Sequence, residues 1–247
     1  MLPAADEFDP LPDDGSAHDS APLGPPHAPL TPAEAPAPSS AACYPPPIGP
    51  GRHLDEAELS RSLEATLADW QRLGCADLWL FGYGSLIWRP DMSFDERVCA
   101  RVHGYHRGLY LWSRVNRGTG AEPGLVLALD RGGSCPGVAF RLAREHMAAE
   151  FPALWRREMA MGSYRPAWLP CSLGDGRRVT ALAFVIRRDA PTYAGRLPDE
   201  MVRIVFARAS GRYGTTLDYV ARTCEALRDS GMPDHALEAR LARCRGD

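Results

Sequence analysis

The clearest candidate for a ligand-binding loop is the stretch Phe81-Gly82-Tyr83-Gly84-Ser85-Leu86, which follows a short apolar run. Gly82 and Gly84 allow a positive φ or a close approach of the backbone to another group. A strand that ends in Gly-x-Gly-Ser can present backbone N–H groups to an anion or an oxyanion. The same pattern is typical of a β-bulge or tight turn without a ligand, so the loop needs a chemical partner elsewhere.

A glutamate within an apolar helical stripe is the clearest candidate for an acid or base. Large apolar side chains recur at helical spacing and predict a core-facing stripe, made of Met147, Phe151, Leu154 and Met161 with Trp155 beside them. Glu158 falls within this stripe. Glutamate is almost never fully buried unless it is paired or functional. Burial would raise its pKa toward neutrality, which suits a general base.

An ion pair is the alternative role for Glu158. Its neighbours in the sequence are Arg156 and Arg157, and side chains one and two positions away point in other directions on an ideal helix. An arginine from another part of the chain could still pair with it. Glu145 and Glu150 fall on flanks of the same helix, where solvent is easier to reach.

Cysteine and histidine residues do not assemble a recognisable site. Cys99, His103 and His106 have a spacing that a strand divides between its two faces, so no metal site is predicted. Cys135 and Cys171 lie in apolar strand contexts, which are typical of inert buried thiols.

Hydroxyl groups give further candidates. The loop does not follow the Gly-x-Ser-x-Gly pattern, so Ser85 lacks the usual setting of an acyl nucleophile. Four tyrosines could be hydrogen-bond donors at a site or half-buried core residues: Tyr83, Tyr164, Tyr193 and Tyr219. Composition does not separate these two roles.

The composition of the 247-residue chain excludes several classes of catalysis. All 28 basic residues are arginine, and without lysine there is no Schiff-base, pyridoxal-phosphate, Walker A or kinase chemistry. Seven scattered cysteines fit reduced thiols better than a disulfide framework. Residues 52–247 carry 28 arginines against 24 acidic residues, a balance too mild to indicate nucleic-acid binding.

Residues 1–52 are predicted to be a disordered acidic tail rich in proline and alanine. Residues 1–51 hold 14 of the 23 prolines and seven acidic side chains, with no arginine. Such a segment buries too little apolar surface to offset its ordering entropy. The first residues lack the basic and apolar regions of a secretory signal, and no run is long enough to span a membrane, so a cytoplasmic protein is expected.

The elements that must position the candidates lie in residues 53–247, which are expected to form one domain. A helix over 53–74, capped by Gly74, comes first. Strands are predicted over 77–81, 98–112, 125–129, 137–142, 164–172 and 178–186. Helices are predicted over 143–161, with an interruption near Pro152, and over 199–209, 215–229 and 234–243. The segments 125–129 and 137–142 are expected to pair as a hairpin around Gly132 and Gly133.

Strands come first and helices last, without β-α-β alternation. This order favours an α+β domain with a curved antiparallel or mixed sheet and packed helices.

With these residues in view, the chain resembles the ChaC family of γ-glutamylcyclotransferases over about residues 77–230. Four stretches carry the resemblance, and they lie within Phe81–Trp88, Gly118–Ala139, Leu154–Tyr164 and Ser210–Tyr219. The first of them is similar to the substrate-binding signature of the family along its whole length. The predicted tail lies outside the resemblance.

The resemblance implies a barrel-like α+β domain and a cytosolic enzyme that cleaves glutathione to 5-oxoproline and cysteinylglycine. It implies no metal or organic cofactor, and Glu158 as the catalytic base. The expected substrate-binding residues are Leu80, Phe81, Gly82, Tyr83, Gly84, Ser85, Tyr164 and Tyr219. The expected partner is a small molecule, without nucleic acid or membrane, and the expected state is a monomer or weak dimer.

Two other functions stay open at this point. The chain could bind a γ-glutamyl or other carboxylate ligand without catalysis, or act on another γ-glutamyl amine. In either cyclotransferase reading, the α-amine of the substrate attacks its own γ-carbonyl. The enzyme then needs only to fix the folded conformer, move a proton and stabilise charge.

Overall fold

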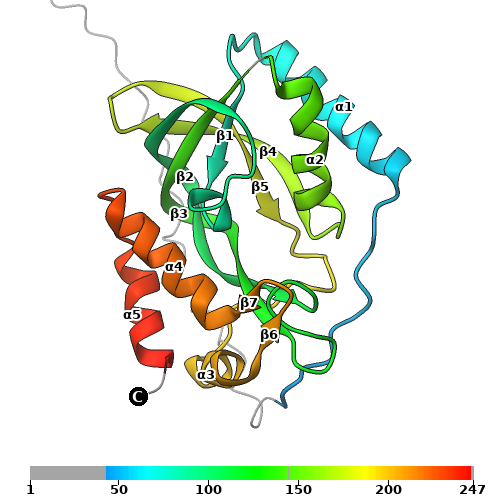
Figure 1. The fold of residues 1–247 in the computed structure, drawn as a ribbon, viewed down its shortest axis with the longest axis vertical. Coiled ribbons are helices and arrows are strands. Elements are labelled where there is room, and N and C mark those ends of the chain that lie inside the picture. Colours follow the sequence, from blue (N-terminus) through cyan, green and yellow to red (C-terminus); the bar gives the residue numbers. More distant parts are fainter. Residues whose placement is uncertain (1–42, 144, 246–247) are drawn as a thin grey trace, which may run out of the picture. The chain divides into compact units, whose positions relative to one another are not determined.

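A five-stranded closed barrel lies at the centre of the fold in a computed structural model of the chain, which describes residues 43–143 and 145–245 (Figure 1). Its strands pair in the order β1-β3-β2-β4-β5, and they are β1 (Trp79–Gly82), β2 (Phe94–Ser113), β3 (Gly124–Leu142), β4 (Tyr164–Leu173) and β5 (Arg178–Ile186). Neighbours are antiparallel except β1 and β5, which run parallel and close the barrel. The predicted α+β fold with a barrel-like mixed sheet is confirmed.

Strand β1 is buried on both faces, which explains its unbroken apolar sequence. Successive side chains of a strand point to opposite faces. Trp79 and Phe81 therefore enter a cluster that draws on all five strands and lies inside the barrel. Leu78 and Leu80 point the other way, into a cluster beneath the first two helices. This double anchoring holds the loop that follows β1 in one position.

Helices cover the barrel in two groups (Figure 1). Helix α1 (Glu56–Leu73) and helix α2 (Met147–Met159) lie side by side over one cluster of buried residues. A second cluster joins α3 (Asp199–Arg208), α4 (Thr216–Asp229) and α5 (His235–Cys244) to β2 and β3. A short 3₁₀ helix, η1 (Ser85–Ile87), follows β1, and a small hairpin, β6 (Ser210–Gly211) with β7 (Gly214–Thr215), precedes α4.

Local sequence signals account for the ends of α1. Asp55 accepts a hydrogen bond from the Glu58 N–H, and the Glu58 side chain accepts one from the Asp55 N–H, which forms a capping box. Gly74 ends the helix with φ of 65°. Within the described ranges, none of the helices combines the length and apolar character needed to cross a membrane.

The predicted hairpin within residues 125–142 is wrong. Residues Gly124–Leu142 form one strand, β3, which pairs along its length with β2. Gly132 and Gly133 have the positive φ values of a turn, 101° and 71°, but they form an irregularity in the pairing opposite Gly104. A β-bulge uses the same residue types as a hairpin turn, so the sequence pattern did not distinguish them.

Two other expectations need correction. Helix α2 runs through Pro152 without interruption. Proline removes one backbone donor there, and the packing of Phe151, Leu154 and Trp155 in the core offsets that loss. The predicted tail, residues 1–52, lies mostly outside the described residues. Its last part is packed, since Tyr44 and Ile48 contact the α3–α5 cluster and the Tyr44 hydroxyl donates to the Pro123 carbonyl at 2.9 Å.

Candidate active site

The glycine loop begins where β1 ends, and its glycines serve close approach. Neither Gly82 nor Gly84 has a positive φ, and that of Gly84 is −131°. A Cβ on Gly84 would lie 2.6 Å from the hydroxyl oxygen of Tyr219 in α4. A Cβ on Gly82 would lie 3.1 Å from the Leu86 side chain. The missing side chain at residue 84 therefore lets a tyrosine hydroxyl reach the loop backbone.

The backbone N–H groups of the loop are available to a ligand, whereas one of its carbonyl groups is hydrogen-bonded to the protein. The N–H groups of Tyr83, Gly84 and Ser85 have no acceptor among residues 43–143 and 145–245. The Tyr83 carbonyl accepts a hydrogen bond of 2.7 Å from Nη1 of Arg107, a fully buried side chain that is paired with Asp234 at 2.7 Å. The hydrogen bond from Arg107 therefore fixes the loop through its carbonyl oxygen, and the loop N–H groups stay free to bind an anionic group.

Glu158 lies in the last turn of α2, and only 17% of its side chain is exposed. Burial raises the pKa of this carboxyl, and the positive charge of Arg157 opposes that rise without cancelling it. The predicted direction of the pKa shift is confirmed.

Arg157 does contact Glu158, which corrects an expectation from helix geometry. Its Nε lies 3.2 Å from Glu158 Oε1. The same guanidinium donates through Nη2 to Ser85 Oγ at 3.2 Å and through Nη1 to Asp91 Oδ2 at 3.1 Å. These tertiary contacts fold the long side chain back along the helix, although the Cα–Cβ directions of adjacent residues diverge. One guanidinium therefore joins the glycine loop to the glutamate.

Three tyrosine hydroxyls lie within electrostatic range of Glu158. Burial is the main cause of a raised pKa in Tyr83, Tyr164 and Tyr219, and the charge of Glu158 raises all three further. The pKa of Tyr219 reaches about 12. The Tyr83 hydroxyl donates to the Phe184 carbonyl at 2.6 Å. The Tyr164 hydroxyl donates to the Leu127 carbonyl at a longer 3.4 Å. All three phenols therefore stay protonated at neutral pH, and the proton of Tyr83 is already committed to a backbone carbonyl.

Of the other candidate residues, two are buried in the core and one lies away from Glu158. Leu80 and Phe81 have fully buried side chains in two different core clusters, so they can offer a ligand only backbone groups. Tyr193, the fourth tyrosine considered, donates to Asp130 at 2.9 Å and takes no part in the group around Glu158.

The thiols and histidines lie apart from the glutamate. Cys135 and Cys171 belong to the barrel interior, where burial raises their pKa values to about 11 and about 12. The two ring nitrogens of His106 contact the Gly132 carbonyl and the Tyr110 hydroxyl. In the part of the chain that the structure describes, no three His, Cys, Asp or Glu side chains are grouped to hold a metal ion.

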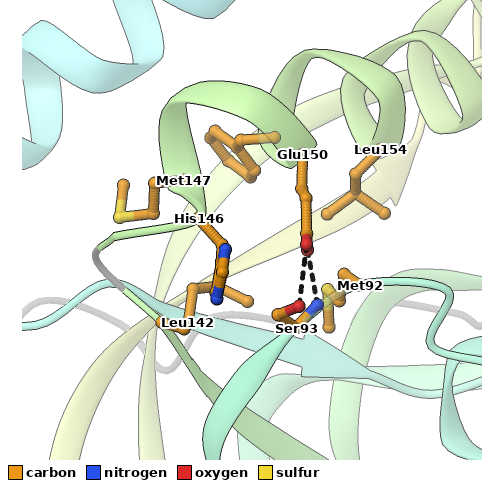
Figure 2. Close-up of a pocket in the computed structure, with 9 residues that line it drawn as sticks. Met92, Ser93, Leu142, His146, Met147, Glu150 and Leu154 are labelled. Carbon is orange, nitrogen blue, oxygen red and sulfur yellow. Dashed lines mark hydrogen bonds between the residues drawn. The ribbon is translucent and has the colours of Figure 1, made fainter.

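Helix α2 holds a second carboxylate in a different setting (Figure 2). Glu150 Oε1 accepts from the Ser93 hydroxyl at 2.7 Å, and Oε2 accepts from the Ser93 N–H at 2.5 Å. These hydrogen bonds lower the pKa of Glu150. The cavity beside it measures about 10 Å³, room for one water molecule at most. Glu150 therefore tethers α2 to the segment before β2.

Sequence reasoning missed two arginines that shape the site. Arg157 was considered only as an ion-pair partner, and Arg107 was not considered. Both act through contacts between segments far apart in the chain, with Ser85 for Arg157 and with Tyr83 and Asp234 for Arg107. The available signal for Arg157 was its place in a motif stretch, whereas Arg107 lies in a strand with several other charged side chains and gave no signal.

Comparison with known proteins gives the family. The model of the ChaC-like protein family matches residues 78–245. The glutathione-specific gamma-glutamylcyclotransferase of Escherichia coli K12 is 39% identical over 176 residues, which cover 71% of this chain and 75% of that protein. The mouse glutathione-specific gamma-glutamylcyclotransferase 1 is 32% identical over 169 residues, which cover 66% of this chain and 75% of that protein.

A solved structure supports the same fold. The selenomethionine-labelled gamma-glutamyl cyclotransferase specific to glutathione from yeast superposes with a TM-score of 0.63 at 22% identity, covering 69% of this chain and 96% of that one. At this identity the match speaks for the fold alone. Because the family model spans more than half of the sequence, the chain belongs to the ChaC-like family.

Proposed function

We propose that the chain is a γ-glutamylcyclotransferase that cleaves glutathione to 5-oxoproline and cysteinylglycine. The observation that carries the proposal is Glu158, a largely buried carboxyl group with a raised pKa, joined through Arg157 to a glycine loop with free N–H groups. The names of the Escherichia coli and mouse relatives support glutathione as the substrate.

The reaction requires no covalent enzyme intermediate. The α-amine of the γ-glutamyl group attacks its own γ-carbonyl carbon, a five-membered lactam forms, and the bond from that carbon to the cysteinyl nitrogen breaks. Both reacting groups belong to one molecule, so the enzyme has to fix the folded conformer. A site without lysine, metal cluster or catalytic triad can do this.

Glu158 is the group that moves the proton in this proposal. At neutral pH the α-amine is an ammonium, which has no lone pair for attack. A carboxylate whose pKa is raised by burial is a stronger base than an exposed one, so it takes this proton more readily. It then returns this proton to the departing cysteinyl nitrogen. The ring nitrogen loses a second proton as the lactam forms, and the amine product takes it up, so cysteinylglycine leaves as an ammonium and Glu158 ends as the carboxylate it began as.

The loop and the tyrosines stabilise charge in the same scheme. Attack converts the γ-carbonyl oxygen to an oxyanion, for which the N–H groups of Tyr83, Gly84 and Ser85 are suitable donors. Tyr164 and Tyr219 add neutral O–H donors close to Glu158. Leu80, Phe81 and Gly82 support the loop from β1 and offer the substrate backbone atoms only.

We further propose that the enzyme works as a monomer or weak dimer in the cytoplasm, with no metal, organic cofactor or nucleic acid. Light scattering during size-exclusion chromatography tests the assembly. Activity after exhaustive dialysis against a chelator tests the independence from metal.

The test of the function is mass spectrometry of glutathione incubated with the purified protein. We expect equimolar 5-oxoproline and cysteinylglycine from the wild type. Tight glutathione binding in calorimetry with no product over hours would instead favour a binding protein. Faster turnover of another γ-glutamyl amine under the same conditions would move the proposal to that substrate.

A further inference from the structure

Arg117, in the segment between β2 and β3, is a buried cation without a carboxylate partner. Only 7% of the residue is exposed. None of the Asp or Glu side chains in residues 43–143 and 145–245 lies within 4.0 Å of its guanidinium. Its Nη1 donates to the Tyr213 carbonyl, and the guanidinium lies 4.9 Å from the ring centroid of Tyr219. A buried charge is costly unless it is paired, so this cation is well placed for an anionic ligand.

Other arginines add to the positive charge at this place. Arg222 stacks on the Trp88 ring at 5.7 Å, the same ring that Arg117 approaches at 5.9 Å. Arg89 stacks on the Tyr213 ring at 5.0 Å. Burial is the main cause that lowers the pKa of Arg117, and the charges of Arg222 and Arg89 lower it further, whereas Tyr219 and the Asp218 carboxylate act in the opposite direction without forming an ion pair. Repulsion among these cations would be relieved by a bound carboxylate.

Tyr219 lies between Arg117 and the catalytic end of the proposed site. Its ring faces the guanidinium, and its hydroxyl lies against Gly84 in the glycine loop. Tyr219 also interacts electrostatically with Glu158. Arg117 therefore borders the proposed site through the ring of Tyr219.

We propose that Arg117 binds the carboxylate of the leaving part of the substrate, which is the glycyl carboxylate of glutathione. This inference rests on the proposed function. Glutathione has two carboxylates, and the α-carboxylate shares a carbon with the attacking amine, so it stays beside Glu158 and the loop. The glycyl carboxylate is at the other end of the molecule, where a planar guanidinium can bind both of its oxygens. Arg117 thereby selects glutathione over γ-glutamyl amines that lack this anion.

The experiment compares glutathione with its glycyl carboxamide, an analogue that keeps every reacting atom and lacks only the terminal charge. We expect the wild type to prefer glutathione in kcat/KM by about 10- to 100-fold, the range for a hydrogen bond to a charged group. Arg117→Gln should lower kcat/KM for glutathione by a larger factor than for the carboxamide, so that the preference for glutathione falls to about one. Arg117→Lys should recover part of the preference, because it restores the charge without the planar fork.

The controls separate this role from a structural one. Arg243→Gln removes an exposed arginine paired with Asp199, and it should keep the wild-type preference. An Arg117→Gln variant that loses the same factor on both substrates would overturn the inference. So would a wild-type preference below about 10-fold, a measurement that needs no variant to fold. If the wild type turned over neither compound, the proposed function would fail and this inference with it.

Discussion

Helix α2 carries two glutamates, eight residues apart, whose environments differ in every respect that sets a pKa. Glu150, near the N-terminus, accepts two hydrogen bonds from Ser93, which lower its pKa. Glu158, in the last turn, is desolvated and has a raised pKa. The helix macrodipole acts in the same sense, since it favours negative charge at the N-terminus and disfavours it at the C-terminus. One carboxylate is a structural acceptor, and the other is prepared to take a proton.

The largest expected effect comes from removing the two carboxylates one at a time. Glu158→Gln keeps the shape of the side chain and removes the proposed base, so kcat/KM for glutathione should fall by about 10²- to 10⁴-fold. Glu150→Gln, the matched control on the same helix, should stay within about twofold of the wild type, as expected of a side chain remote from the reaction. Equal losses of kcat/KM in the two variants would contradict the assignment of different roles to Glu150 and Glu158.

The next effect concerns the approach of Tyr219 to the loop. Gly84→Ala adds a Cβ 2.6 Å from the position of the Tyr219 hydroxyl, and this tyrosine is held by Arg117 and Trp88. The displaced loop or ring should lower kcat/KM by about 10- to 100-fold, in line with the cost of small misplacements.

Gly120→Ala is the control for that change, because nothing lies within 4 Å of the Cβ it would add. The variant should retain the wild-type rate. An active Gly84→Ala enzyme would show that the close contact is dispensable.

A smaller effect should follow when Arg157 is removed. Its charge partly offsets the burial of Glu158, so Arg157→Met should raise the pKa of Glu158 further. The proposed base works when deprotonated, so we expect activity to be lost as pH falls through the pKa of Glu158. The acidic limb of the kcat/KM profile should therefore move to higher pH in Arg157→Met. At neutral pH the rate should fall by about 10-fold because the link to Ser85 is also lost.

Arg156→Met serves as the control, since Arg156 pairs with Glu56 on the outer face of α2. The pH profile of kcat/KM for Arg156→Met should coincide with that of the wild type. If the acidic limb moved to lower pH in Arg157→Met, the assignment of Glu158 as the titrating base would be untenable.

The smallest expected effect is on thermal stability, and its sign is opposite for substitutions at Glu158 and Glu150. The folded-state pKa of Glu158 is raised, so its ionisation destabilises the fold as pH rises from the unfolded value through the folded one. Glu158→Gln should therefore raise the melting temperature at pH 7, by on the order of 2 °C.

The folded-state pKa of Glu150 is lowered, so its contribution is present above the unfolded value and is lost as pH falls through the folded pKa. Glu150→Gln should therefore lower the melting temperature at pH 7. Differential scanning fluorimetry of the two variants checks both signs, and a lower melting temperature for Glu158→Gln would contradict the assigned cost of its burial.

Sequence patterns were sufficient where periodicity and composition decide the structure. The apolar stripe of α2 pointed to Glu158, and the apolar run before the loop pointed to β1, because burial of each element follows from its own spacing. The same reasoning failed for β3, since Gly132 and Gly133 have positive φ in a bulge as they would in a turn.

The roles of the arginines and tyrosines depended on tertiary contacts. Arg157 reaches Ser85 across 72 positions of sequence, and Arg117 reaches the ring of Tyr219 from another loop. Tyr193 and Tyr219 were both candidate hydrogen-bond donors, but only Tyr219 reaches Gly84, whereas Tyr193 donates to Asp130. Local patterns carry no information on such pairings, which arise when the barrel closes.

The two glutamates of α2 should titrate on opposite sides of the pKa of an ordinary carboxyl group. Carbon-13 NMR titration of the side-chain carboxyls in the wild type, with assignments from Glu150→Gln and Glu158→Gln, measures this directly. We expect the pKa of Glu158 above the usual 4.5 and that of Glu150 below it. A Glu158 pKa at or below that of Glu150 would show that Glu158 is not prepared to act as a base.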